Sequence, residues 1–234
     1  MPMLPLALLA GGLATRLDAV AAGRPKSLVP VAGEPFIAHQ LRLLRRQGIT
    51  RVVLCLGHLG SMIEAFVGDG SAFGLSVVCQ FDGDTLLGTA GALRQALPLL
   101  GERFLVLYGD SYLDIPFAPV QKAFERGEAP ALMTVLRNEG RWDNSNVVFD
   151  GTRIICHDKR VRDPRMHYID YGLSVASAEV FAALSAGQAF DLADVYGLLA
   201  RQGRLAGYEV FRRFYEIGTP EGLADTDAFL RRAR

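Results

Sequence analysis

The sequence predicts an α/β protein, with a three-layer α/β/α arrangement around a mostly parallel mixed sheet. Two observations support this prediction. In residues 1–108, short apolar runs that suit buried strands alternate with segments of helical periodicity, which is typical of parallel, doubly wound sheets. Beyond Pro130 the segments look like shorter strands that suit antiparallel pairing, so we expect the sheet to be mixed.

The expected elements follow one another closely in the first half of the chain. Residues 4–10 form an apolar run, short enough for a buried strand, that ends at two glycines. Residues 36–44 place apolar side chains at helical spacing, and Gly48 is positioned just beyond the end of this helix. The next expected elements are a strand at 51–56, a helix at 61–67, a strand at 75–80, a helix at 89–100 and a strand at 104–108.

The second half adds short strands and two helices. We expect strands at 131–136, 146–150 and 153–157, the last two joined by a turn at Asp150-Gly151. Residues 191–202 and 220–232 have the pattern of helices. Because no Pro-, Gly- or Ser-rich linker and no internal repeat divides the chain, we expect residues 1–234 to form a single domain.

Composition excludes several classes of protein. Half of the 234 residues are hydrophobic and 21% are charged, an ordinary globular mixture rather than that of a disordered chain. The 25 basic residues equal the 25 acidic ones, so we expect no nucleic-acid partner. No apolar run reaches the ~18 residues of a membrane span, so we expect no membrane partner. The first residues lack the basic region of a signal peptide, and three cysteines suit buried free thiols, so we expect a cytoplasmic protein.

The most informative segment is the loop after the first strand. Residues 9–17 are Leu-Ala-Gly-Gly-Leu-Ala-Thr-Arg-Leu, and Arg24-Pro25-Lys26 follows. Glycines directly after a buried strand let backbone N–H groups approach a phosphate, and Arg16 and Lys26 would add two cations there. The segment is neither a G-x-G-x-x-G fingerprint nor a Walker A loop. From the residues alone, phosphate binding and a plain tight turn both remain open.

This segment resembles the signature of the sugar-1-phosphate nucleotidyltransferases, the NDP-sugar pyrophosphorylases. The similarity continues through residues 25–35, 87–93, 109–110 and 216–220, at the spacing found in that family. The resemblance implies the Rossmann-like fold of the nucleotide-diphospho-sugar transferases. It also implies the condensation of a nucleoside triphosphate with a sugar 1-phosphate, giving an NDP-sugar and pyrophosphate. Because no hexapeptide repeat is present, we expect no C-terminal β-helix domain of the kind that larger relatives carry.

The resemblance also implies roles for individual residues. The expected catalytic residues are Arg16, Lys26 and Asp110. The expected nucleotide-binding residues are Leu9, Ala10, Gly11, Gly12, Gln80, Gly88 and Thr89. The expected sugar-phosphate-binding residues are Gly91, Asn146, Asp158, Lys159 and Gly172. The expected cofactor is Mg²⁺, held by Asp110 and Glu216.

The chemistry of these side chains suits the implied roles. Asp110 follows an apolar strand at the sheet edge where α/β proteins bind ligands, and Mg²⁺ prefers one or two carboxylates together with substrate oxygens. Without the motif, a turn would explain Asp110 equally well. Glu216 stands where the family usually has Asp before Ile-Gly-Thr-Pro, but its longer carboxylate can still bind Mg²⁺. Gln80 can both donate and accept toward a base edge, and Lys159 offers a cation to a sugar phosphate, although a solvated basic cluster also explains it.

The sugar and the base stay open at this point. Residues 87–93 favour an enzyme like the D-glycero-D-manno-heptose 1-phosphate guanylyltransferases, which use GTP to make GDP-heptose for a capsule or cell-envelope polysaccharide. Residues 68–75 and 96–101 favour the alternative, an N-acetylmuramate 1-phosphate uridylyltransferase or another hexose 1-phosphate nucleotidyltransferase. We expect small-molecule substrates and a monomer or homodimer.

Two hypotheses from other functional classes compete with the nucleotidyltransferase hypothesis. A GT-A glycosyltransferase would use an Asp-x-Asp motif and would not need Arg16 with Lys26, since no pyrophosphate leaves. A non-catalytic nucleotide-sugar sensor should have lost Lys26 or Asp110, and this sequence keeps both.

Overall fold

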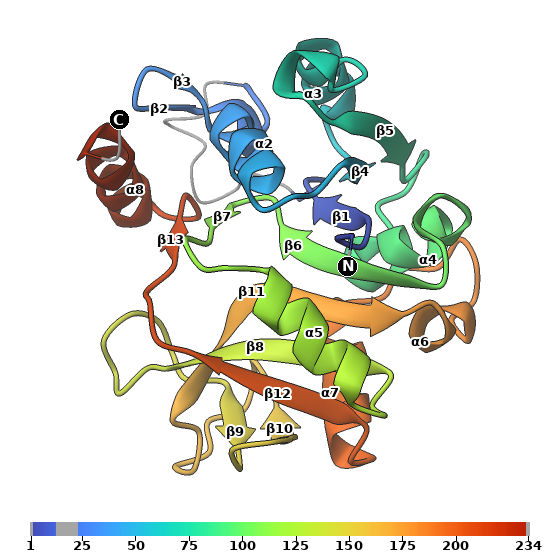
Figure 1. The fold of residues 1–234 in the computed structure, drawn as a ribbon, viewed down its shortest axis with the longest axis vertical. Coiled ribbons are helices and arrows are strands. Elements are labelled where there is room, and N and C mark those ends of the chain that lie inside the picture. Colours follow the sequence, from blue (N-terminus) through green and yellow to red (C-terminus); the bar gives the residue numbers. More distant parts are fainter. Residues whose placement is uncertain (1, 13–22, 233–234) are drawn as a thin grey trace.

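The computed structural model describes residues 2–12 and 23–232, and a nine-stranded sheet runs through its centre (Figure 1). The strand order is β10-β9-β11-β6-β1-β4-β5, while β8 pairs with β11 and β12 pairs with β8. The strands are β1 Leu6–Leu9, β4 Arg51–Leu56, β5 Ser76–Phe81, β6 Arg103–Tyr108, β8 Ala131–Arg137, β9 Val147–Phe149, β10 Ile154–His157, β11 Tyr168–Ser177 and β12 Leu205–Val210. Strands β6, β1, β4 and β5 are parallel, and β11 joins them antiparallel to β6. The predicted α/β class with a mixed sheet is confirmed.

Helices cover both faces of the sheet because side chains alternate along each strand. Leu6 and Leu8 belong to one core cluster, which includes apolar residues of α2, α3 and α5. Ala7, between them, belongs to a second cluster with α4, α6 and α7. The helices are α2 Phe36–Arg46, α3 Gly60–Val67, α4 Gly88–Leu100, α5 Ala118–Arg126, α6 Glu179–Ala182, α7 Leu192–Arg201 and α8 Pro220–Arg232. The three-layer arrangement therefore has a separate apolar core on each side of the sheet.

The predicted elements occur within two residues of their expected bounds, and the predicted turn at 150–151 does join antiparallel strands β9 and β10. Helices α5 and α6 and strands β11 and β12 were not predicted. Strand β11 lies between β6 and β8 in the sheet, yet Asp170, Gly172 and Ser174 interrupt its apolar pattern. A buried strand with polar residues at these positions has no clear sequence signal, so only its pairing identifies it.

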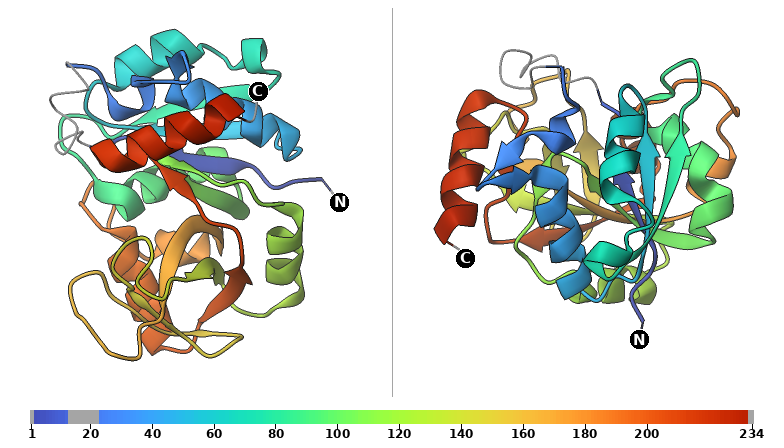
Figure 2. Two further views of the ribbon diagram at one scale, coloured as in Figure 1. Left: turned by 90° about the vertical axis from the view of Figure 1, so that its left-hand side faces the viewer. Right: turned by 90° about the horizontal axis from the view of Figure 1, so that it is seen from above.

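Two small two-stranded sheets attach the C-terminal part of the chain to the main one. Strand β7 (Ser111–Tyr112), just after β6, pairs with β13 (Tyr215–Glu216), and β2 (Pro30–Val31) pairs with β3 (Glu34–Pro35). Helix α8 packs beside these strands along one side of the molecule (Figure 2), where Leu230 joins a third apolar cluster. The β7–β13 pairing thus brings residues more than one hundred positions apart to the same place.

No helix in the described parts of the chain is long and apolar enough to cross a membrane. The three cysteines are free thiols, as expected, but they differ in burial. Cys55 is buried, whereas Cys79 and Cys156 are only half-buried. The expectation of buried thiols is therefore correct for Cys55 alone.

Candidate active site

A cavity of about 240 Å³ opens at the edge of the sheet where β1, β4, β5 and β6 end. It is lined by Leu9, Ala10, Gly11, Gly12, Lys26, Ser27, Cys55, Asp82, Leu86, Gly88, Thr89, Ala92, Tyr108, Gly109 and Asp110. Eight of the ten residues predicted to bind the nucleotide or to be catalytic, Asp110 among them, thus line one cavity. Arg16 lies outside the described residues.

Glycines form the floor of this cavity because neighbouring strand ends approach too closely for side chains. A Cβ on Gly11 would lie 2.8 Å from the backbone nitrogen of Gly57, which follows β4. A Cβ on Gly109 would lie 2.6 Å from the carbonyl oxygen of Leu9. These contacts are shorter than real Cβ atoms make, so glycine is required at both positions. The same absence of side chains leaves the backbone after β1 accessible to a ligand.

Lys26 and Asp110 meet at one end of the cavity. The Nζ atom of Lys26 lies 3.2 Å from Oδ2 of Asp110, and the two side chains are 21% and 34% exposed. Lys26 begins a short 3-10 turn over residues Lys26–Leu28, and Asp110 lies two residues beyond the end of β6, after Gly109. One cation and one carboxylate, 84 positions apart in the sequence, are therefore paired at the same site.

Glu216 is held beside this pair by the pairing of β13 with β7. Glu216 is paired with Ser111, and the backbone N–H of Ile217 donates to the carbonyl oxygen of Asp110 at 2.9 Å. One carboxylate oxygen of Glu216 accepts a hydrogen bond from the Gly218 N–H at 3.2 Å. Burial, and then the nearby Asp110 carboxylate, raise the pKa of Glu216 above its usual range. The Asp110 carboxylate thus lies near a partly buried second carboxylate, that of Glu216.

These two carboxylates fit the donor set that Mg²⁺ requires. Their mutual repulsion is the kind of electrostatic cost that a bound divalent cation removes. In residues 2–12 and 23–232, no three His, Cys, Asp or Glu side chains lie close enough to hold a metal ion by themselves. A Mg²⁺ ion here would therefore need further oxygens from substrate phosphates, as Mg²⁺ sites with one or two carboxylates usually do.

Helix α4 begins at the cavity with two of the predicted residues, Gly88 and Thr89, which both line it. Gly88 has a φ of +66°, and a Cβ there would lie 2.6 Å from the carbonyl oxygen of Phe190. The Thr89 hydroxyl donates to Asp191 at 3.2 Å and accepts from the Leu192 N–H at 2.7 Å, which ties the start of α4 to the start of α7. This anchoring fixes the wall of the cavity on the α4 side.

Two predicted residues of this region do not line the cavity. Gln80 lies on β5, and its amide nitrogen donates to the carbonyl oxygen of Phe81 at 3.2 Å. Gly91 lies in α4, where a Cβ would come within 2.6 Å of the Gln188 carbonyl oxygen. The structure accounts for Gly91 through close packing of α4 against the loop before α7. Asp82, which was not predicted, lines the cavity two residues beyond Gln80.

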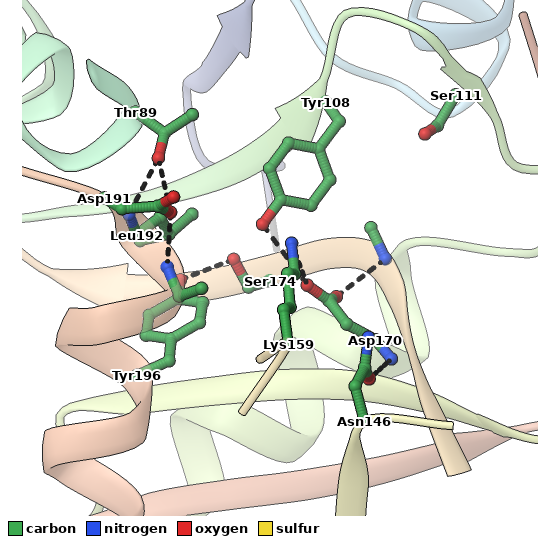
Figure 3. A network of polar contacts seen from close by, with 12 residues as sticks. Thr89, Tyr108, Ser111, Asn146, Lys159, Asp170, Ser174, Asp191, Leu192 and Tyr196 are labelled. Carbon is green, nitrogen blue, oxygen red and sulfur yellow. Dashed lines mark hydrogen bonds and ion pairs between the residues drawn. The ribbon is translucent and has the colours of Figure 1, made fainter. Parts of the chain in front are cut away.

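A polar cluster centred on Asp170 lies next to the cavity (Figure 3). The Asp170 side chain is only 7% exposed, and it accepts hydrogen bonds from the Tyr108 hydroxyl at 3.2 Å and the Gly172 N–H at 3.0 Å. The Lys159 ammonium lies 3.9 Å from the same carboxylate and 5.2 Å from the centre of the Tyr108 ring. Burial, and then the Asp170 charge, raise the pKa of Tyr108 well above 10, so the phenol keeps its proton and donates.

This cluster gathers three of the five predicted sugar-phosphate residues. Asn146 accepts from the Asp170 N–H at 3.0 Å, while Gly172 and Lys159 contact the Asp170 carboxylate. Asp158 points elsewhere, since its Oδ1 accepts from the backbone N–H groups of Arg160 and Val161. Asp158 and Lys159 also line a second cavity of about 350 Å³ beside α7.

Sequence reasoning missed Asp82, Tyr108 and Asp170. The available signal for Asp170 was a lone acid between Ile169 and Tyr171 in an otherwise apolar segment. Its place became clear only from the antiparallel pairing of β11 with β6, in which Leu173 is opposite Leu107. This register puts Asp170 and Gly172 at the same edge of the sheet as Tyr108 and Asp110.

The order of these groups along the sheet edge suggests how ligands could lie there. Going from β5 to β11, one meets the Asp82 carboxylate, the glycine floor, the Lys26–Asp110 pair and the Asp170 cluster. The apolar part of the cavity, with the Asp82 carboxylate, is thus followed by the glycine loop with Lys26. Next come the carboxylates of Asp110 and Glu216, and then the second cation, Lys159. This series suits a ligand with a base, a chain of phosphates and a second phosphate group.

Known proteins resemble the chain along nearly its whole length. The family model for nucleotidyl transferases matches residues 7–231. The chain is 32% identical to an N-acetylmuramate alpha-1-phosphate uridylyltransferase from Neisseria meningitidis, over 94% of this chain and 96% of that protein. It is 27% identical to a mannose-1-phosphate guanylyltransferase from Mycobacterium tuberculosis, over 91% of this chain but only 60% of that protein.

A solved structure supports the fold. A putative glucose-1-phosphate thymidylyltransferase from Bacillus anthracis matches with a TM-score of 0.85 at 23% identity, covering 97% of this chain and 95% of that one. At this identity the likeness concerns the fold alone.

Proposed function

The chain belongs to the nucleotidyl transferase family, and we propose that it transfers a nucleotidyl group from a nucleoside triphosphate to a sugar 1-phosphate. The observation that carries the proposal is the meeting of Lys26, Asp110 and Glu216 beside the glycine-floored cavity. The loop after β1 leaves backbone N–H groups accessible to phosphates. Next to it, one cation could neutralise phosphate charge and two carboxylates could bind a metal ion, which is what the transfer of a phosphoryl-type group requires. The Asp170 cluster, with Lys159, would receive the second substrate.

The proposed reaction needs alignment and fixed charge more than acid–base catalysis. A phosphate oxygen of the sugar 1-phosphate attacks the α-phosphorus of the triphosphate, a new P–O bond forms, and the bond to the β-phosphate breaks to release pyrophosphate. The second pKa of a phosphate monoester is about 6, so the attacking oxygen is ionised at neutral pH and no general base is required. Lys26 would stabilise the negative charge that accumulates on the leaving pyrophosphate, and Arg16 is predicted to do the same.

We propose Mg²⁺ as the cofactor, with Asp110 and Glu216 as its protein ligands. When bound, the ion would supply positive charge to the phosphate oxygens. Glu216 lies in β13 and Asp110 directly precedes β7, so the pairing of these two strands positions both carboxylates. The strand partner of Glu216 is Ser111, directly after Asp110, and this pairing supports the proposal that the longer Glu216 side chain binds the ion where the family usually has Asp.

For the substrates we propose GTP and a heptose 1-phosphate, with a nucleotide-activated heptose as product. The second candidate is uridylyl transfer to N-acetylmuramate 1-phosphate. It is favoured by the Neisseria meningitidis relative, which this chain matches at 32% identity over nearly the whole of both proteins.

The test is a pyrophosphate-release assay with purified protein and Mg²⁺. Each of GTP, UTP, ATP, CTP and dTTP is combined with heptose, mannose, glucose and N-acetylmuramate 1-phosphates. We expect release that depends on both substrates, with mass spectrometry identifying the NDP-sugar. Absence of pyrophosphate with every pair would overturn the proposed function. Release of a nucleoside diphosphate from an NDP-sugar would point instead to a glycosyltransferase.

A further inference from the structure

Asp82 is placed where the base of a nucleotide would lie. It follows β5, whereas Asp110 follows β6, and the sheet order β6-β1-β4-β5 puts three strand spacings between them. At about 4.8 Å per spacing, this is about 14 Å across the cavity edge. Since Lys26 and the glycine floor suit phosphates at the β1–β6 end, the base must lie toward β4 and β5. This inference rests on the proposed use of a nucleoside triphosphate.

The walls around Asp82 offer few other polar contacts. Leu86 and Ala92 contribute apolar surface, and Cys55 contributes a buried thiol. Burial raises the pKa of Cys55 to about 12, so the thiol is neutral and only a weak hydrogen-bonding partner. Asp82 is therefore the only carboxylate at this end of the cavity among the lining residues that the structure describes.

The Asp82 carboxylate is held rigidly but is only partly used by the protein. Its Oδ2 accepts from the Leu87 N–H at 3.1 Å, and its own N–H donates to the Leu56 carbonyl oxygen at 2.9 Å. Gln95, from α4, binds the preceding carbonyl oxygen at 2.7 Å. Oδ1 accepts no hydrogen bond from any residue within the described ranges. Burial raises the pKa of Asp82, and donors from a ligand would relieve that cost.

We propose that Asp82 selects guanine by accepting hydrogen bonds from its N1–H and exocyclic N2 amine. Guanine presents these two donors side by side, with no acceptor between them. Uracil and thymine offer one N–H between two carbonyl oxygens, which a carboxylate repels. Adenine and cytosine place a ring-nitrogen acceptor next to their amine. Asp82 is thus a specificity-determining residue, and it takes the role that Gln80 was predicted to have.

The first test uses the wild-type protein and needs no substitution. Inosine triphosphate differs from GTP by loss of the N2 amine, so it removes one of the two proposed donors. We expect its non-hydrolysable analogue to bind about tenfold more weakly than the GTP analogue in isothermal titration with Mg²⁺, since a hydrogen bond to a charged group is involved. The UTP analogue should bind more weakly still. Equal affinity for the guanine and inosine analogues, or tighter binding of the uracil analogue, would overturn the proposal.

The second test is Asp82→Asn. The amide oxygen can keep the bond from Leu87 N–H, so a merely structural role is preserved while the cavity receives a donor instead of an acceptor. We expect the preference for the GTP analogue over the UTP analogue to fall by about 10- to 100-fold. The matched control is Asp84→Asn, which removes the same charge from an exposed side chain outside the cavity lining. It should change both affinities equally.

An unchanged preference in a folded Asp82→Asn variant would overturn the proposal, and circular dichroism establishes that it is folded. Because binding is measured without turnover, the result is separable from the proposed function. Guanine-selective binding without pyrophosphate release would refute the proposed reaction and support Asp82. Pyrophosphate release without guanine selectivity would do the reverse.

Discussion

Asp110→Asn removes one charge from the Lys26–Asp110 pair while keeping the size of the side chain. At 3.2 Å, two unit charges in water attract by about 1.3 kcal/mol. The side chains are 21% and 34% exposed, and ion pairs of this kind contribute about 0.2–1 kcal/mol after screening and loss of side-chain entropy. Relief of the repulsion with Glu216 acts in the opposite direction. We therefore expect the free energy of unfolding to change by less than about 1 kcal/mol.

The effect on turnover should be much larger. Loss of one preorganised charge costs about 10²–10³ in rate, equivalent to about 2.7–4 kcal/mol in the activation barrier. We expect kcat for pyrophosphate release to fall by that factor, and the stabilisation of the protein by Mg²⁺ and nucleotide in thermal unfolding to shrink. Urea denaturation of the same preparation measures the free energy of unfolding.

Asp114→Asn is the matched control, because Asp114 also forms an ion pair, with Arg212 at 3.1 Å, and lies four residues further along the chain. It should leave both turnover and stability nearly unchanged. The reasoning is refuted if Asp110→Asn retains more than a tenth of wild-type turnover. It is also refuted if stability falls by more than about 2 kcal/mol, since the loss of activity would then follow from misfolding.

Three other substitutions test separate parts of the structure. The fold raises the pKa of Glu216 above 4.5, so the ionised carboxylate destabilises the folded state. Glu216→Gln should therefore raise the free energy of unfolding, measured in urea, at pH 7 but not near pH 3.5, where the carboxyl group is protonated. The same substitution should lower turnover. Gly91→Ala puts a Cβ 2.6 Å from a carbonyl oxygen and should cost about 1–3 kcal/mol in urea denaturation, whereas Gly127→Ala, with nearest atoms at 3.6 Å, should stay within about 0.5 kcal/mol. Asp170→Asn should raise KM for the sugar 1-phosphate about tenfold without raising KM for the nucleotide. Because Asp170 and Lys159 are in contact, adding Lys159→Ala should raise KM by less than the product of the two single effects. An equal rise in both KM values would contradict a role of Asp170 in binding the sugar 1-phosphate.

Much of the first half of the fold could be predicted because its signals are local. Strand β1 is a continuous apolar run, β4 and β6 are apolar after an initial arginine, and α2 and α4 have helical periodicity. Each of these elements can be recognised without knowing its neighbours. Strand β11 could not be recognised in this way, since polar residues interrupt it and its pairing with β6 and β8 defines it. The glycine loop, Lys26 and Asp110 were similarly predictable, because a motif at fixed spacing carries them.

The sequence by itself determined the α/β class, the family resemblance and the short motifs around Lys26, Asp110 and Glu216. Only the tertiary structure decided that Asp82, rather than Gln80, lines the cavity, and that Asp170 joins Tyr108 and Lys159 in one cluster. The physical reason is that strand order and register bring together residues that are far apart in the chain. Local hydrophobic patterns specify which residues form a strand, but the neighbours of that strand depend on packing across the whole sheet.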